Sequence, residues 1–487
     1  MLALKNPALL RGQSYINGQW VDSDNGETVP VLNPSTGATL IDIASCGVDE
    51  TRRAIAAAEA AMPAWAGKPA KERANILRVW YNLILANLDD LSLILTAEQG
   101  KPLAEAKGEI IYGANYIEWF AEEAKRVYGD IIPAPSGDKR VVVVKQPVGV
   151  VASITPWNFP NAMITRKAAP ALGAGCTFVG KPATETPLSA LALAVLAEQA
   201  GIPAGVFNMV CGKSSRAIGG EMTSNPSVRK VTFTGSTPVG KVLMAQCAET
   251  VKKTSMELGG NAPFIVFDDA DLDAAVKGAV ASKYRNAGQT CVCSNRMLVQ
   301  ASIYDAFTDK LAAAVKELKM GDGQQAGINL GPMINNKAAN DVDAMVQDAL
   351  EKGAVAKLGG KKSSLGACFY EPTILTSVST DMRVFSEEIF GPVAPIFKFE
   401  DEAEAIKMAN DTEFGLAAYF YTRDIGRVWR VGEALEYGIV GINEGIISNE
   451  MAPFGGVKES GSGREGSKYG MDDYLEIKYM CMGGLDK

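Results

Sequence analysis

One cysteine stands out as a possible nucleophile. Cys291 lies in the run Asn286-Ala-Gly-Gln-Thr-Cys291, in a chain of 487 residues that contains no histidine. A cysteine attacks carbon as a thiolate, and its usual proton acceptor is an imidazole. Covalent chemistry at Cys291 must therefore use a carboxylate, an ordered water, or stabilisation by backbone amides and cations.

Glu257 is the candidate carboxylate. It ends a strand-like run, Thr254-Ser-Met-Glu257, and the pair Gly259-Gly260 follows closely. A base placed where the chain leaves a sheet can reach into a cleft, and glycines let backbone or ligand approach closely. A surface glutamate at a turn fits the same spacing, so both interpretations stay open.

Composition limits the class of protein. The length predicts two or three domains, and 47% hydrophobic with 21% charged residues is typical of a soluble enzyme. A net charge of −8 disfavours nucleic acid and anionic membranes as partners. The eight cysteines are scattered and the start lacks a signal-peptide pattern, so we expect a cytoplasmic protein. No apolar run reaches the roughly 18 residues that span a bilayer.

The chain begins with helical patterns and then becomes alternating. Apolar residues repeat at helical spacing over residues 49–65, 71–99 and 102–127. A β-branched run at 140–147 follows, which predicts an exposed hairpin or an edge strand that seeks a partner, or else an ordinary strand.

From residue 149 to 260 short apolar strands alternate with helices, which predicts a parallel sheet covered on both faces, a nucleotide-binding architecture. A second alternating set, from 263 to about 441, contains Cys291. The active site should lie in the cleft between the two.

Two glycine motifs do not carry the functions they suggest. The run Gly461-Ser-Gly463-Arg-Glu-Gly466 fits the dinucleotide fingerprint, but no strand–helix–strand unit surrounds it. The run Gly235-Ser-Thr-Pro-Val-Gly240-Lys241 resembles a P-loop, but Val242 stands where a hydroxyl must hold magnesium. What remains is a turn at a helix start whose free amides can receive a pyrophosphate.

Taken together, several motifs resemble the aldehyde dehydrogenase superfamily, in the right order over nearly the whole chain. They are Thr155-Pro-Trp-Asn158-Phe-Pro160, Lys181-Pro-Ala, Phe233-Thr-Gly-Ser236-Thr, Met256-Glu257-Leu-Gly-Gly260, Gly288-Gln-Thr-Cys291, Glu387-Glu388-Ile-Phe390-Gly-Pro392 and Pro453-Phe-Gly-Gly456. The resemblance implies an α/β fold with two doubly wound, Rossmann-like parallel-sheet domains and a small β oligomerisation region. We expect the cofactor-binding domain at 1–129 and 149–259, the catalytic domain at 260–463, and oligomerisation segments at 130–148 and 470–487.

The resemblance also implies a mechanism. The Cys291 thiolate adds to the aldehyde carbon, and the Asn158 amide with the Cys291 backbone N–H holds the oxygen that becomes negative. Hydride passes to a nicotinamide, and Glu257 deprotonates the water that hydrolyses the thioester.

Cofactor residues carry over by position: Thr155, Trp157, Lys181, Thr184, Gly235, Ser236, Glu388 and Phe390. NAD-preferring relatives carry a glutamate where this chain has Thr184, and a threonine hydroxyl tolerates a ribose 2′-phosphate that a carboxylate would repel. We therefore expect NADP as the preferred cofactor and NAD as a possible one, with Glu185 tempering the preference, and no metal.

Within the superfamily the chain is similar to the succinate-semialdehyde dehydrogenases, through Phe159-Pro-Asn-Ala-Met-Ile-Thr-Arg166-Lys, Arg285-Asn-Ala-Gly-Gln-Thr-Cys-Val-Cys293, Gly445-Ile-Ile-Ser448 and Gly466-Ser-Lys-Tyr-Gly470. The similarity implies that Arg166, Arg285 and Ser448 bind the far carboxylate of a small carboxylate aldehyde. Structural ion pairs are the alternative for both arginines.

Other functions stay open or are disfavoured. Glutarate semialdehyde is one methylene longer, which is worth only about 1 to 3 kcal/mol of discrimination. Acyl transfer to coenzyme A is disfavoured because Glu257 is present. A non-enzymatic thiol sensor or cofactor-binding protein would not need Asn158, Glu257 and Cys291 together.

Cys293 and the oligomeric state complete the expectations. Cys293 is either a small buried side chain or, as the resemblance suggests, a redox partner that closes a disulfide on Cys291; a zinc site is disfavoured. The resemblance implies a homodimer or homotetramer that pairs residues 140–144 and 474–479 across subunits.

Overall fold

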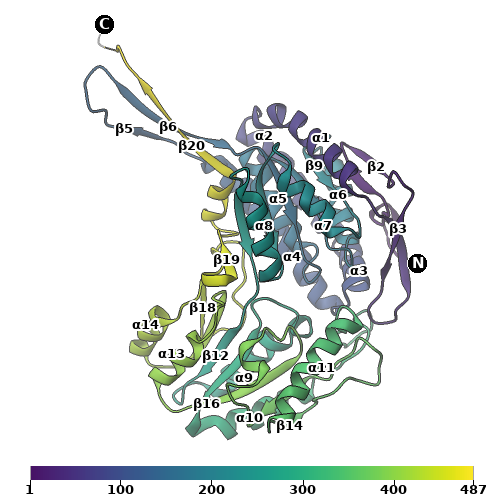
Figure 1. The fold of residues 1–487 in the computed structure, drawn as a ribbon, viewed down its shortest axis with the longest axis vertical. Helices are drawn as coiled ribbons and strands as arrows, with labels where there is room; N and C mark the ends of the chain where they lie inside the picture. Colours follow the sequence, from purple (N-terminus) through teal and green to yellow (C-terminus); the bar gives the residue numbers. More distant parts are fainter. Residues whose placement is uncertain (1, 486–487) are drawn as a thin grey trace.

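The computed structural model describes residues 2–485 and shows two α/β halves, with an arm that projects from one of them (Figure 1). Each half is built on its own mainly parallel sheet, and helices cover both faces. The predicted fold class is confirmed. None of the helices within residues 2–485 is long and apolar enough to cross a bilayer.

The first sheet has the strand order β19-β11-β10-β7-β8-β9-β1-β2. Its parallel strands are β7 (Val150–Ile154), β8 (Thr177–Lys181), β9 (Phe207–Met209), β10 (Val228–Thr234) and β11 (Lys253–Glu257). The antiparallel additions are β1 (Ser14–Ile16), β2 (Gln19–Val21) and β19 (Gly461–Ser462). The glycine run at 461–466 thus supplies a short edge strand next to β11.

Helices α5 (Ala162–Ala174), α6 (Leu188–Gln199), α7 (Ser215–Ser224) and α8 (Thr237–Ala248) connect these strands. The N-terminal region adds a hairpin of β3 (Thr28–Leu32) and β4 (Thr39–Ala44), and helices α1 (Val48–Ala66), α2 (Ala70–Ala86), α3 (Leu88–Gln99) and α4 (Leu103–Glu123). The helical spacing over 71–99 does not correspond to one continuous helix. The chain breaks at Asn87, whose non-helical backbone and side-chain bond to the Leu83 carbonyl (2.8 Å) separate α2 from α3.

Helix α4 packs closely on α5, which carries residues of the site. A side chain at Gly113 of α4 would lie 2.7 Å from the Asn161 Oδ1 atom and 2.9 Å from the Thr165 hydroxyl. Only glycine permits this approach, so α4 lies directly behind the first turn of α5.

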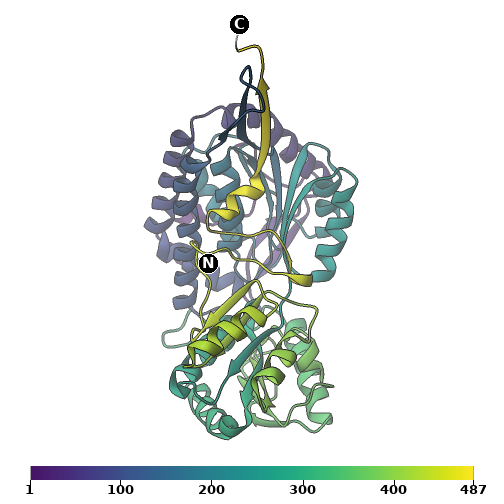
Figure 2. The same cartoon turned by 90° about the vertical axis from the view of Figure 1, so that its left-hand side faces the viewer.

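The second sheet has the order β14-β15-β16-β13-β12-β17-β18. Its strands are β12 (Ala262–Val266), β13 (Ser294–Gln300), β15 (Thr373–Thr376), β16 (Val393–Phe399), β17 (Ala417–Tyr421) and β18 (Ile439–Ile442), all parallel, and the antiparallel β14 (Val355–Leu358). The covering helices are α9 (Leu272–Tyr284), α10 (Tyr304–Lys316), α11 (Asn336–Glu351), α12 (Arg383–Ser386), α13 (Glu402–Asn410) and α14 (Ile425–Ala434). Figure 2 shows the two halves one above the other, with the arm beyond the first.

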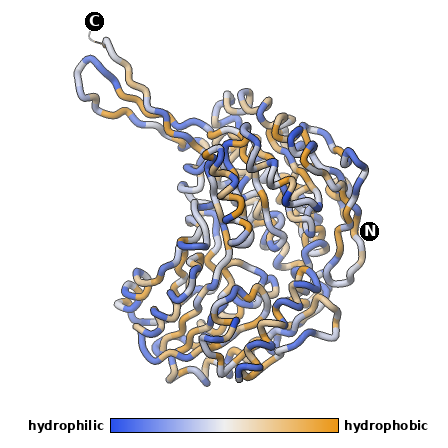
Figure 3. Tube along the Cα trace, in the orientation of Figure 1, coloured by the Kyte–Doolittle hydropathy of each residue, from blue (hydrophilic) through white to orange (hydrophobic). Residues whose placement is uncertain are grey.

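The arm consists of β5 (Asp130–Ile132), β6 (Arg140–Pro147) and β20 (Leu475–Met482) in the order β20-β6-β5. Of the alternatives for 140–147, the exposed hairpin is confirmed, because β5 and β6 pair antiparallel. The edge strand is wrong: β6 is the middle strand, because β20 pairs with it antiparallel over its full length within the same chain and not across subunits. Apolar residues run along these strands although they project from the body (Figure 3). Ile131, Ile477 and Tyr479 are exposed.

Candidate active site

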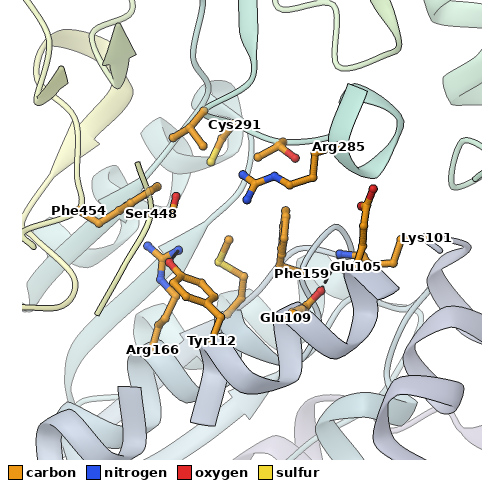
Figure 4. Close-up of a pocket in the computed structure, with 14 residues that line it drawn as sticks. Lys101, Glu105, Glu109, Tyr112, Phe159, Arg166, Arg285, Cys291, Ser448 and Phe454 are labelled. Carbon is orange, nitrogen blue, oxygen red and sulfur yellow. Dashed lines mark hydrogen bonds and ion pairs between the residues drawn. The ribbon is translucent and has the colours of Figure 1, made fainter. Parts of the chain in front are cut away.

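Cys291 lies between two cavities, each of about 240 Å³. The first cavity lies between α4, α5 and the loops of the second half, and Figure 4 shows the side chains that face into it. Those that matter below are Tyr112, Phe159, Arg166, Arg285, Ser448 and Phe454. The second cavity is lined by Trp157, Asn158, Gly235, Ser236, Glu388 and Phe390, among others. Cys291 lines both, so one sulfur can meet ligands that enter from either side.

An unusual loop between α9 and β13 places Cys291. Asn286, Ala287 and Gly288 all have left-handed backbone, with φ of 51°, 53° and 75°. A side chain at Gly288 would lie 2.1 Å from the Gly391 carbonyl oxygen. Two non-glycine residues in this region are strained, and such strain persists where the surroundings hold it in place.

The end of β11 brings Glu257 to the same region. A side chain at Gly260 would lie 2.5 Å from the Cys291 carbonyl oxygen, so the two segments are in contact. Glu257 is buried, not a surface residue, and its Oε2 atom has no hydrogen-bond partner among the described residues. Burial, and then the negative charge of Glu465, raise the pKa of Glu257 well above its ordinary value.

Burial is also the main influence on the Cys291 thiol. It raises the pKa of the thiol to about 12, and the carboxylates of Glu388 and Glu257 act in the same direction while Arg166 opposes them. These surroundings favour the neutral thiol over the thiolate. A positive charge that enters either cavity would favour the thiolate.

A buried ion cluster centred on Glu465 lies behind the site. Arg166 donates from Nε to Glu465 Oε2 (2.7 Å), and Lys167 pairs with the other carboxylate oxygen. Lys167 also donates to the Thr234 hydroxyl (2.7 Å). Although burial opposes it, the two cations hold the pKa of Glu465 below its ordinary range. The sequence predictions missed Glu465, although two adjacent cations on the buried helix α5 require a buried carboxylate.

The two predicted arginines differ in how far they are already neutralised. Arg166 lines the first cavity but is paired with Glu465, and its guanidinium stacks on Phe454 (4.2 Å to the ring centroid). Arg285 has no ion pair within residues 2–485, and its Nε atom is buried without an acceptor there. Its guanidinium points into the cavity below Cys291 (Figure 4). The ion-pair alternative thus describes Arg166 in part and not Arg285.

The second cavity has features that fit a nucleotide. Ser236 precedes α8 without capping it through its side chain, which leaves the helix amides free for a phosphate. Trp157 and Phe390 meet edge to face at 5.5 Å between ring centroids and form an aromatic wall. Burial raises the pKa of Glu388 to about 8, against the opposing effect of the Gly260 N–H that it accepts at 3.0 Å.

Three predicted cofactor residues lie outside the lining of this cavity. Thr155 and Lys181 lie at the ends of β7 and β8, which are parallel neighbours. Lys181 donates to the Pro182 carbonyl (3.0 Å) and Thr184 to the Gly212 carbonyl (3.1 Å). The Thr155 hydroxyl is buried and finds no partner in the described part of the chain.

Asn158 and Cys293 occupy defined positions. The Asn158 amide donates from Nδ2 to the Gln289 carbonyl (3.1 Å), which leaves its second N–H unused. Cys293 is buried, and its thiol donates to the Ser282 carbonyl (2.9 Å) at the end of α9. The redox role of Cys293 stays a prediction.

Three known proteins are similar to this chain over almost their whole length. The chain is 63% identical over 484 residues to a glutarate-semialdehyde dehydrogenase of Pseudomonas aeruginosa. The match covers 99% of this chain and 100% of that protein. It is 63% identical over 482 residues to an NADP(+) succinate-semialdehyde dehydrogenase of Escherichia coli, with the same coverage. A 3-sulfolactaldehyde dehydrogenase of Pseudomonas putida is 62% identical over 487 residues and is covered completely, as is this chain.

A solved structure agrees with the computed one. The crystal structure of succinate-semialdehyde dehydrogenase from Burkholderia pseudomallei matches with a TM-score of 0.98 at 63% identity, over 99% of this chain and all of that one. The model of the aldehyde dehydrogenase family matches residues 20–480. The chain therefore belongs to the aldehyde dehydrogenase family and is an NAD(P)-dependent oxidoreductase.

Proposed function

We propose that this enzyme oxidises succinate semialdehyde to succinate with NADP. The observation that carries the proposal is the unpaired guanidinium of Arg285, which shares one cavity with Cys291, Arg166 and Ser448. A buried donor without an acceptor, such as the Arg285 Nε–H, is costly, and a substrate carboxylate would supply the acceptor and the opposite charge. The Escherichia coli relative is named for this substrate and cofactor, which supports the assignment.

Each catalytic residue has one role in the proposal. Cys291 forms a bond to the aldehyde carbon, and the free N–H of Asn158 with the Cys291 N–H stabilises the negative oxygen. NADP supplies the hydride acceptor, and the helix α8 N-terminus, Glu388 and the aromatic wall would hold it. Glu257 then takes a proton from the water that cleaves the thioester; burial raises its pKa above the ordinary value, which makes its carboxylate a stronger base.

Cofactor choice rests on Thr184. A carboxylate at this place would repel a 2′-phosphate, whereas the Thr184 hydroxyl and the Lys181 ammonium both tolerate one. We expect turnover with NADP to exceed turnover with NAD, and Thr184→Glu to reverse the order. Steady-state kinetics with both cofactors test this, and a wild-type enzyme that favours NAD contradicts it.

Glutarate semialdehyde is the second candidate, because the Pseudomonas aeruginosa relative is named for it. The two substrates differ by one methylene, and the position of Arg285 relative to Cys291 decides which chain length fits. We expect kcat/KM to be highest for the four-carbon semialdehyde. A panel of four- and five-carbon semialdehydes and 3-sulfolactaldehyde tests the choice, and a higher kcat/KM for either of the other two replaces it.

Assembly and location extend the proposal. We propose a homodimer or homotetramer in which the arm contacts a second subunit, because apolar residues on β20 are exposed in the single chain. All eight cysteines are free thiols among the described residues, which favours a reducing, cytoplasmic setting.

A further inference from the structure

The main-chain carbonyl of Asn158 accepts hydrogen bonds from two buried side chains. Lys101 donates from Nζ at 2.8 Å, and Asn286 donates from Nδ2 at 3.0 Å. A peptide carbonyl seldom needs an ammonium donor, and the segment it fixes carries the amide proposed to hold the oxyanion. Neither Lys101 nor its partner Glu109 has a role in the chemistry described above.

Lys101 is itself held in place. It is buried between α3 and α4, pairs with Glu109 Oε2 at 2.6 Å, and its ammonium lies 3.8 Å from the centroid of the Phe159 ring. The other Glu109 oxygen accepts from the main-chain N–H groups of Asn161 (2.9 Å) and Ala162 (3.2 Å). The ion pair therefore fixes both ends of residues 158–162, as Figure 4 shows for Lys101, Glu109 and Phe159.

The catalytic half holds the same segment from the other side. Asn286 is fixed by Gln99, which donates to its Oδ1 (2.9 Å), and by Glu105, which accepts from its main-chain N–H (2.8 Å). The Gln289 carbonyl accepts from the side chains of both Asn158 (3.1 Å) and Asn286 (3.2 Å). Asn286 and the Gln289 carbonyl, both in the loop before Cys291, thus link the main-chain carbonyl of Asn158 to its side-chain amide.

Stability alone does not explain this arrangement. A buried ion pair usually breaks even at best against well-packed apolar residues, because both ions lose their hydration. Displacing a reacting group by about 1 Å costs on the order of 100-fold in rate, and removing one oxyanion donor costs about 100- to 1,000-fold. A device that fixes the direction of one amide therefore affects catalysis more than folding.

We propose that Lys101, held by Glu109, is a positioning residue that orients Asn158 so that its free N–H meets the oxygen of the reacting aldehyde. The proposal rests on the role of Asn158 given above. Lys101 borders the substrate cavity, but its side chain is only 1% exposed, and in this proposal it acts through the Asn158 carbonyl. Its loss should lower kcat while cofactor affinity stays within twofold.

A double-mutant cycle tests the proposal. Lys101→Met and Asn158→Ala are made singly and together, and the first-turnover rate of cofactor reduction is measured with succinate semialdehyde and with propanal. Lys101→Met should reduce the rate about 10- to 100-fold alone, but no more than twofold in the Asn158→Ala background, since its effect passes through that side chain. Equal losses in both backgrounds, or an unaffected rate in either single variant, would overturn the proposal.

Controls separate positioning from folding and from substrate choice. Glu98→Gln alters another buried carboxylate, which accepts from the Leu188 (2.7 Å) and Ser189 (2.8 Å) N–H groups and makes no side-chain hydrogen bond to Lys101, Glu109 or Asn158 within the described residues. It should lower Tm as much as Lys101→Met with less than threefold change in rate; a similar loss of rate in Glu98→Gln contradicts positioning. If Lys101→Met does not fold, Lys101→Met/Glu109→Gln removes both charges and enters the same cycle.

Propanal distinguishes failure of this inference from failure of the proposed substrate. If succinate semialdehyde is not oxidised but propanal is, the proposed function fails and the cycle with propanal still decides the role of Lys101. If both are oxidised and the cycle is additive, the substrate assignment stands and the positioning role is contradicted.

Discussion

At the scale of single residues, Arg285 is the residue that we propose selects a negatively charged substrate. Its guanidinium forms no ion pair within residues 2–485, whereas that of Arg166 pairs with Glu465. A hydrogen bond to a charged group contributes about 1.5 to 3 kcal/mol, so Arg285→Ala should raise KM for the semialdehyde about 10- to 100-fold. KM for butanal, which lacks the carboxylate, should change less than threefold. Equal effects on both aldehydes would refute this role.

Glu465 should set the pH dependence of thioester hydrolysis. Glu257 must be deprotonated to act, so the hydrolysis rate rises as pH passes its pKa. Burial and Glu465 raise that pKa, while Arg166 and Lys167 lower it. Glu465→Gln removes the negative charge and frees both cations, and both changes lower the pKa of Glu257. The rising limb should move to lower pH in single-turnover measurements of hydrolysis; an unmoved limb contradicts the coupling.

Sequence could name the residues that we propose meet the reactants, but not the residues that hold them. Cys291, Glu257, Asn158, Arg166 and Arg285 were named from motifs, and the fold brings them to one region. Glu465 lies in the glycine run at 461–466, which has no function by itself and gains one because β19 pairs with β11. Lys101 and Glu109 lie on helices whose orientation toward α5 depends on long-range packing, which local periodicity does not encode.

At the scale of elements, the sequence predicted the bounds of helices and strands well where the strands that pair lie close together in the chain. The alternating region 149–260 was predicted well because each strand is a short apolar run between helices. The break at Asn87 depends on one side chain that donates to the Leu83 carbonyl of the preceding turn. The place of β6 in the middle of the arm depends on β20, more than 320 residues later in the chain. Pairing over such distances is invisible to periodicity.

The exposed face of β20 should mediate assembly. Ile477 and Tyr479, with 72% and 62% of their surface exposed, lie two residues apart and so share one face of the strand. Ile477→Glu/Tyr479→Glu should convert the oligomer to monomers in light scattering after size exclusion, because charge on an apolar contact opposes association. Lys478→Ala, on the opposite face, is the control. A double variant with unchanged mass would contradict the role of this face.

At the scale of the whole molecule, the two halves contribute different parts of one reaction. In the proposed mechanism the second half supplies the Cys291 nucleophile, and the first supplies Glu257 from the end of β11 and Asn158 from the loop after β7. This division separates formation of the thioester, which needs Cys291 and Asn158, from its hydrolysis, which needs Glu257.

Rapid mixing of Glu257→Gln enzyme with cofactor and aldehyde tests that division most directly. The account predicts a burst of reduced cofactor close to one equivalent per active site, at a rate near that of the wild type, followed by steady turnover reduced at least 100-fold. Cys291→Ala should give neither burst nor turnover. A Glu257→Gln enzyme that shows no burst, or that turns over at the wild-type rate, would contradict the central claim.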